Sequence, residues 1–119
     1  MLPNNVPAFS AIPANASANS KALWADKIVR CSVQALASAA NTGTIQLQGS
    51  NDQATGANPW QFQPTNWSDI GSALTLSGTT PVLLTEVECS YEYLRIVYTD
   101  ASGGTATGTV SARVKSMGL

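Results

Sequence analysis

The chain has 119 residues, which is enough for one domain with a modest hydrophobic core. Only 11% of the residues are charged, against a usual value of about 25%, and six scattered basic residues with a net charge of −1 argue against nucleic-acid binding. Because the chain has no His, the Ser-His-Asp and Cys-His forms of nucleophilic catalysis are excluded, and we expect neither an enzyme nor a bound cofactor.

Residues 1–20 are rich in Pro and Asn and contain no charged residue. Each Pro removes a backbone donor and favours an extended chain, which is one sign of a disordered leader. The spaced apolar residues Val6, Phe9 and Ile12 favour instead an extended arm that docks on a neighbouring subunit or on the domain's own flank. We therefore divide the chain into an N-terminal arm, 1–20, and a β-sandwich domain, 21–119.

From about Lys21 onward, apolar and polar residues alternate in short segments, which predicts β-strands. The segment 93–98 is apolar on both faces, so we expect it in the middle of a sheet. Turn-forming clusters separate the segments, and no helical stripe is present. The sequence predicts an all-β, antiparallel β-sandwich. The expected strands are 28–36, 44–48, 82–87, 93–98 and 109–115.

Cys31 and Cys89 are the only cysteines, and their spacing matches no metal or redox motif. Cys31 falls on the apolar face of the 28–36 strand, where a small buried side chain is expected. The N-terminus lacks the pattern of a secretory signal, and no segment is apolar enough to cross a membrane. We therefore expect synthesis in a cytoplasm, with both thiols reduced and no membrane partner.

The loop that follows the 44–48 strand carries the side chains with the most binding chemistry. Asn51 and Asp52, in "LQGSND", are turn residues because their side chains can bond to their own backbone. Trp60 and Phe62, in "NPWQFQP", can stack on a sugar ring, bury in a neighbouring subunit, or fold back on the core. All three outcomes remain open from the sequence alone.

Trp67, in "NWSDI", is large enough to close one end of a two-sheet core. If Trp67 and Ile70 are both buried, the strand needs a bulge at 68–69. Arg95 shares a strand face with Tyr93, and we expect its guanidinium to pair with a carboxylate rather than with a ligand. The candidate partners are Glu92, Asp69 and Asp100.

A calcium site built from Asp52, Asp69 or Asp100 is a weaker interpretation, because these acids sit singly and lack the spacing of a calcium loop. We therefore expect no metal. A carboxylate pair for catalysis is also a weak interpretation. The nearest group of acids is Glu86, Glu88 and Glu92, where like charges along a strand suit a solvated edge.

The segments "LQGSND", "NWSDI", "YEYLRIVYTDASGG" and "GTVSARVKSMGL" follow one another between roughly residues 45 and 118. This layout resembles the core of discoidin-like jelly-roll domains of the coagulation-factor type C group. It is also similar to small virion proteins of tailed bacteriophages, in which such a pattern recurs in chains of about this size. The resemblance implies a jelly-roll β-sandwich that decorates or cements the outside of a phage capsid.

On this resemblance we expect a virion protein that is assembled in the host cytoplasm and lies on the capsid exterior. Its expected partners are the major capsid protein and sister copies, in a dimer or a trimer. The expected interface residues are Val6, Phe9, Ile12, Trp60 and Phe62. The residues expected to shape turns and core are Asn51, Asp52, Trp67, Tyr93 and Arg95.

The alternative function is a carbohydrate-binding module, or a β-sandwich associated with a tail or an adhesin. A glycan would then stack on aromatic rings and bond to neighbouring polar side chains. The candidate residues for this site are Trp60, Phe62, Tyr91, Asn51, Asp52 and Asn58.

Overall fold

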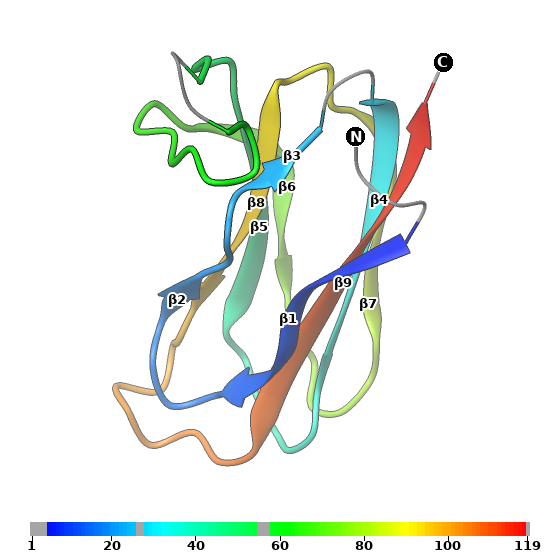
Figure 1. Cartoon of the computed structure of the whole chain (residues 1–119). Coiled ribbons are helices and arrows are strands. Elements are labelled where there is room, and N and C mark those ends of the chain that lie inside the picture. Colours follow the sequence, from blue (N-terminus) through cyan, green and yellow to red (C-terminus); the bar gives the residue numbers. More distant parts are fainter. Residues whose placement is uncertain (1–4, 26–27, 55–57, 119) are drawn as a thin grey trace.

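A computed structural model of the chain describes residues 5–25, 28–54 and 58–118 (Figure 1). Within these residues every regular element is a β-strand. The strands are β1 (Asn5–Pro13), β2 (Ala18–Asn19), β3 (Leu23–Trp24), β4 (Ile28–Ala37), β5 (Thr44–Ser50), β6 (Ser68–Thr75), β7 (Val82–Glu88), β8 (Tyr93–Thr99) and β9 (Thr109–Gly118). The described part of the chain contains no helix that is long and apolar enough to cross a membrane.

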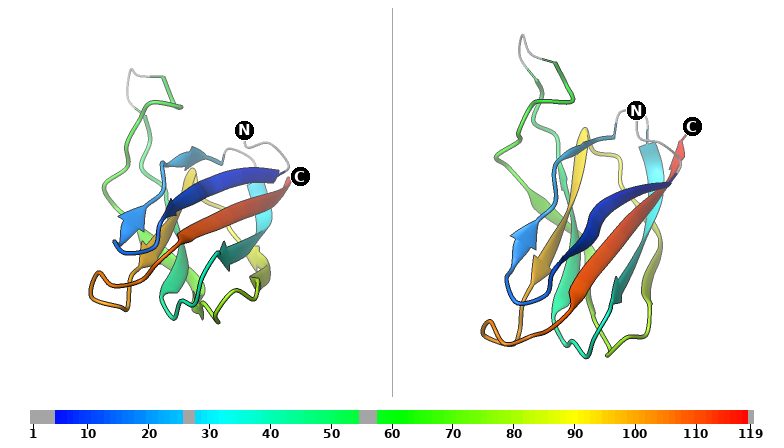
Figure 2. Two further views of the ribbon diagram at one scale, coloured as in Figure 1. Left: turned by 90° about the horizontal axis from the view of Figure 1, so that it is seen from below. Right: turned by 60° about the horizontal axis from the view of Figure 1, so that its bottom comes forward.

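The strands form two antiparallel sheets that face each other as a β-sandwich (Figures 1 and 2). The four-stranded sheet has the order β1-β9-β4-β7, and the five-stranded sheet has the order β2-β8-β5-β6, with β3 also paired to β8. The predicted all-β fold with antiparallel sheets is confirmed. The five expected strands are present as β4, β5, β7, β8 and β9, and β8 lies inside its sheet, as its two apolar faces predicted.

The core lies between the sheets and combines small side chains from one sheet with large ones from the other. The inner face of the four-stranded sheet is built mainly from small residues such as Ala35, Ala37 and Ala112. The five-stranded sheet faces them with larger side chains, among them Leu47 and Tyr98, which are 1% and 0% exposed. Large side chains opposite small ones allow the two layers to interdigitate without cavities.

The described part of the expected N-terminal arm belongs to the two sheets. β1 pairs with β9 at the edge of the four-stranded sheet, and β2 pairs with β8 in the other sheet. Phe9 is 4% exposed and lies in the core, and Ile12 packs against the core. These two side chains serve the chain's own core, so we no longer assign them to a subunit interface. Val6 lies opposite Val114 in the β1–β9 ladder, and the side chain of Val6 is not among those that the structure describes.

The bulge in β6 lies further along the strand than the sequence suggested. Register is regular at 68–69, where the pairs Gly49–Ser68 and Gln48–Asp69 are in place, and Trp67 is only half-buried, so the condition for a bulge at that point is not met. The register shifts between Ile70 and Leu74, where Gly71 has a φ of 69°. Gln46 donates from Nε2 to the Ile70 and Gly71 carbonyls at 3.2 and 3.3 Å, which satisfies backbone groups that the bulge takes out of the ladder.

Candidate functional site

The described parts of the loop between β5 and β6, residues 51–54 and 58–67, lie over the outer face of the five-stranded sheet at one end of the sandwich (Figure 1). One carboxylate ties the two ends of this loop together. Asp52 accepts hydrogen bonds from the Thr65 and Asn66 amides at 2.8 and 2.9 Å, and from Asn66 Nδ2 at 3.0 Å. Asn51 links the loop to the next one, because its Oδ1 accepts from the Glu92 amide at 3.1 Å.

The expected role of Asn51 and Asp52 in a turn is thus extended by a role in loop closure. The hydrogen bonds from Asn66 and Thr65 hold the pKa of the Asp52 carboxyl below its usual range, because they favour the charged form. The Asp52 side chain is half-buried, and its oxygens accept from all three of these donors. Asp52 is therefore charged at neutral pH, and its hydrogen bonds to residues 65 and 66 hold the two ends of the loop together.

Four aromatic side chains, which we call the aromatic lobe, gather beneath and on this loop. They are Trp24, Trp60, Phe62 and Tyr93. Tyr93 forms the base: it is 1% exposed, and its hydroxyl donates to the Pro59 carbonyl at 2.7 Å. Phe62 lies against it with ring centroids 5.6 Å apart. Burial, and secondarily the charge of Glu92, raises the pKa of the Tyr93 phenol, which keeps it protonated as a donor.

The top of the lobe is a pair of indoles. Trp60 and Trp24 pack edge to face, with centroids 4.9 Å apart and planes at 83°. Trp24 stands on β3 directly opposite Tyr93 and donates from Nε1 to Glu92 Oε1 at 3.1 Å. Trp60 is nevertheless 58% exposed. A large apolar ring is therefore held in place by its neighbours while more than half of its surface faces water.

A second aromatic contact continues from the lobe along the same outer sheet face. Arg95, Gln48 and Asp69 lie side by side across β8, β5 and β6. Arg95 Nε donates to Gln48 Oε1 and Gln48 Nε2 donates to Asp69 Oδ1, both at 2.8 Å. The Arg95 guanidinium lies 4.4 Å from the Trp67 ring centroid, a cation–π contact. Partial burial lowers the pKa of Arg95, because burial disfavours the charged form.

Two expectations for these residues change in detail. Trp67 is only half-buried and lies just before β6, where its Nε1 donates to the Pro64 carbonyl at 3.0 Å. It covers Arg95 on the outer face rather than closing the core between the sheets. Arg95 reaches a carboxylate only through Gln48, so its link to Asp69 is indirect.

The three acids considered for a calcium site do not come together. Asp52 follows the end of β5, whereas Asp100 follows Thr99, which pairs with the start of β5 at the other end of the sandwich. The Asp100 oxygens accept from the Ser102 amide and hydroxyl and from the Gly104 amide. Asp52 and Asp100 therefore each organise a separate loop, whereas Asp69 lies in β6 and accepts from Gln48. No group of three or more His, Cys, Asp or Glu side chains within the described residues is arranged to hold a metal.

The stretch of chain that carries Trp60 is neutral and polar. The sequence from Gln53 to Trp67 contains no charged residue, and the exposed side chains of this stretch are mostly amides. They include Gln53, Asn58, Gln61, Gln63 and Asn66. Such a surface can make van der Waals contacts through the indole and neutral hydrogen bonds around it, whereas an ionic partner would find no opposite charge within the stretch.

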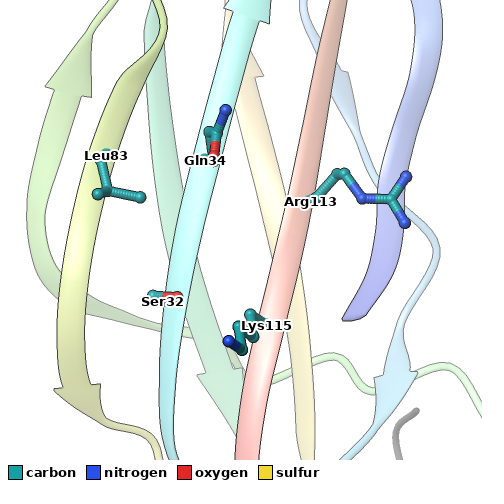
Figure 3. Close-up of a pocket in the computed structure, with 5 residues that line it drawn as sticks. All are labelled: Ser32, Gln34, Leu83, Arg113 and Lys115. Atoms are coloured by element: carbon teal, nitrogen blue, oxygen red, sulfur yellow. The ribbon is translucent and has the colours of Figure 1, made fainter. Parts of the chain in front are cut away.

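Two shallow hollows lie elsewhere on the molecule. The first, of about 210 Å³, is on the outer face of the four-stranded sheet and is lined by Ser32, Gln34, Leu83, Arg113 and Lys115. Figure 3 shows Leu83 on one side and the Arg113 side chain turned towards β1, away from Leu83. The second, of about 310 Å³, lies among residues 40–43, Ser102 and residues 105–107, at the end opposite the lobe. Neither hollow has an exposed aromatic ring.

Sequence reasoning missed Trp24 as a member of the lobe and Glu92 as the acceptor that holds Trp24. β3 has only two residues, too few for an alternating pattern to show. Trp24 meets Trp60 and Tyr93 only because the segment 18–25 runs along β8, with the Ser20 amide and hydroxyl bonded to Ile96 at 2.8 Å. The one signal in the sequence was the isolated Trp itself, in a segment too short to show a pattern. No family model, curated protein or solved structure matches the chain.

Proposed function

We propose that the chain is a non-catalytic structural virion protein, a decoration or cement subunit that attaches to the outer surface of a phage capsid through the aromatic lobe. The observation that carries this proposal is the exposure of Trp60 on a base that is already ordered. Trp24 braces the ring, Glu92 anchors Trp24, and Asp52 closes the loop. A preorganised apolar side chain loses little conformational entropy on docking, and Trp is enriched among residues that dominate interface energies.

We further infer that the sandwich is a jelly roll. Support comes from the strand orders, β1-β9-β4-β7 and β2-β8-β5-β6, because the chain passes repeatedly from one sheet to the other. Long crossings of this kind define interlocked Greek keys, and jelly rolls are widely used in viral capsid proteins and in lectins. This association concerns the architecture alone, so the function still depends on the lobe.

Sister copies are the second expected partner. β1 lies at the edge of the four-stranded sheet, and an edge strand presents backbone groups that a strand of another copy can pair with. We propose a dimer or trimer formed at this edge, with the N-terminal segment as its contact. Light scattering on the purified chain measures the assembly mass, and a monomer across the concentration range would remove this part of the proposal.

The capsid proposal is tested with Trp60→Ala and the matched variant Gln61→Ala, whose side chain is also exposed and lies next to Trp60. In co-sedimentation with particles that lack the protein, Trp60→Ala is expected to weaken binding by about 30-fold, corresponding to roughly 2 kcal/mol. Gln61→Ala should bind within a few-fold of the wild type. Absence of the chain from purified particles, or equal binding by both variants, would contradict the proposal.

A neutral glycan is the second candidate partner, and the uncharged amides around Trp60 favour it. Sugar rings present an apolar C–H face that packs on an indole, while their hydroxyls bond to amides such as Asn58 and Gln61. A glycan array with the isolated chain separates the two functions, since it contains no capsid. Binding that is lost in Trp60→Ala and weakened in Gln61→Ala would favour the glycan, whereas an array without signal leaves the capsid as partner.

A further inference from the structure

Cys31 and Cys89 lie together in the core at the junction of β4 and β7. In the β4–β7 ladder Cys31 is opposite Val87 and Arg30 is opposite Glu88, so Cys89, one residue beyond β7, is the diagonal neighbour of Cys31. The two side chains are 3% and 0% exposed, and both are free thiols. Neither contributes to the aromatic lobe or to its loop.

The two sulfur atoms are in contact and differ in character. The Cys31 thiol hydrogen-bonds to the Cys89 sulfur, and this bond, with burial, raises the pKa of Cys31 far above its ordinary value. The same bond lowers the pKa of Cys89, although burial opposes the change. Cys89 is therefore the sulfur that more readily forms a thiolate, the reactive form in thiol–disulfide exchange.

We propose that Cys31 and Cys89 form an oxidation site, at which a disulfide ties β4 to the end of β7 when the protein meets an oxidising thiol–disulfide environment. Diagonal neighbours in a ladder are about 7–8 Å apart, and a disulfide needs Cα atoms within about 4.4–6.8 Å. Closure thus requires a shift of about 1–2 Å. Cys89 is the side that moves, because it lies outside the ladder in a turn where the Tyr91 amide donates to its carbonyl at 2.7 Å.

Glutathione disulfide supplies the oxidising equivalents in this step. The Cys89 thiolate attacks one sulfur of glutathione disulfide, forms a mixed disulfide and releases one glutathione, which takes up a proton. Cys31 then loses its proton, attacks the Cys89 sulfur and expels the second glutathione. Two protein thiols become one disulfide, and one glutathione disulfide becomes two glutathione molecules. Because Cys89 is buried, the first attack occurs when the end of β7 opens.

The test exposes the full chain to excess glutathione disulfide by two routes: as the folded protein, and during refolding from denaturant. Samples are then unfolded and treated with N-ethylmaleimide, and intact mass counts the free thiols. We expect two alkylated thiols in the reduced protein and none, with no glutathione attached, in the oxidised protein. The oxidised protein should unfold at a temperature at least about 5 °C higher, since the cross-link restricts the unfolded chain.

Cys31→Ala is the matched control, because it keeps Cys89 and removes its partner. This variant should carry one glutathione or one alkylated thiol, and its unfolding temperature should not rise on oxidation. Two alkylated thiols in the wild type after both routes would overturn the proposal. Glutathione adducts without an internal disulfide, or disulfide-linked dimers on a non-reducing gel, would overturn it as well. The result is independent of whether the chain binds a capsid.

Discussion

Single side chains in the aromatic lobe divide into those that build it and one that faces outward. Tyr93 builds it, because the ring is buried under the loop and the hydroxyl reaches the Pro59 carbonyl. Trp60 rests on top with most of its surface exposed. Replacing Tyr93 should therefore change the stability of the protein, whereas replacing Trp60 should change its binding to a partner.

We predict that Tyr93→Phe lowers the free energy of unfolding by about 1 kcal/mol, because the half-buried Pro59 carbonyl loses its donor while the ring remains. Urea unfolding followed by Trp fluorescence measures the change. Tyr91→Phe is the control, since the Tyr91 ring packs on Gly49 and keeps this contact in the variant. A Tyr93→Phe protein as stable as Tyr91→Phe would show that the Pro59 contact contributes little.

Among the elements, β1 shows how far the sequence could be read. The spacing of Val6, Phe9 and Ile12 predicted an extended arm, whereas residues 5–13 form a strand of the chain's own four-stranded sheet. Its pairing with β9 joins residues about a hundred positions apart, which no local pattern encodes. Its irregular register, with Ala11 at a φ of 56°, hides the strand from a period-two search.

For β1 we predict that Phe9→Ala lowers the free energy of unfolding by about 3–5 kcal/mol, the cost of a large cavity in a core. Ser10→Ala, at an exposed neighbouring position, should stay within about 0.5 kcal/mol of the wild type. Chemical denaturation measures the free energy of unfolding, and a low protein concentration keeps contacts between copies from contributing to it. Equal stability of the two variants would mean that Phe9 is held by a neighbouring subunit instead.

β6 was not among the strands predicted from alternation, because its residues do not alternate. Most of its side chains are exposed, and Ile70 is its one buried apolar residue. The strand exists because β5 pairs with it and because Gln46 bonds to the carbonyls at the bulge. By contrast, β5 alternates over most of its length and β8 is apolar on both faces, and both strands were predicted nearly to their ends. Pattern reading succeeded where one face is buried and failed where partners far away in the sequence define the strand.

Gly71 is the residue in β6 with the clearest backbone requirement. At a φ of 69°, an L side chain is strained, so we predict that Gly71→Ala costs about 1–2 kcal/mol of stability. Ser72→Ala, at the adjacent exposed position, should be nearly neutral. Thermal unfolding monitored by circular dichroism compares the two. A neutral Gly71→Ala would imply that the bulge relaxes into a regular register.

On the scale of the whole molecule, the two ends of the sandwich are each organised by one carboxylate. Asp52 closes the lobe end and Asp100 closes the loop between β8 and β9, and hydrogen bonds hold the pKa of both below the usual range. A group whose pKa is lower in the folded state stabilises the fold above its unfolded pKa, which is about 3.9 for Asp. That contribution disappears as the pH falls through the lower, folded value.

We therefore predict that the unfolding temperature is flat near neutral pH and falls below about pH 4. Asp52→Asn combined with Asp100→Asn should be less stable at pH 7 and should lose less on acidification. Differential scanning calorimetry between about pH 2 and 7 follows both proteins. Parallel curves for the wild type and the double variant would show that other carboxylates govern the acid response.

The two ends of the sandwich carry different features. β1 begins and β9 ends at the same end of the sandwich as the lobe, and the loop with Gly103 and Gly104 lies at the other end (Figure 1). If the lobe binds to a particle, a tag fused next to the start of β1 or the end of β9 would lie close to the surface that contacts the particle. A peptide cargo inserted between Gly103 and Gly104 would instead be presented to the surroundings. The fold thereby offers a built-in site for surface display.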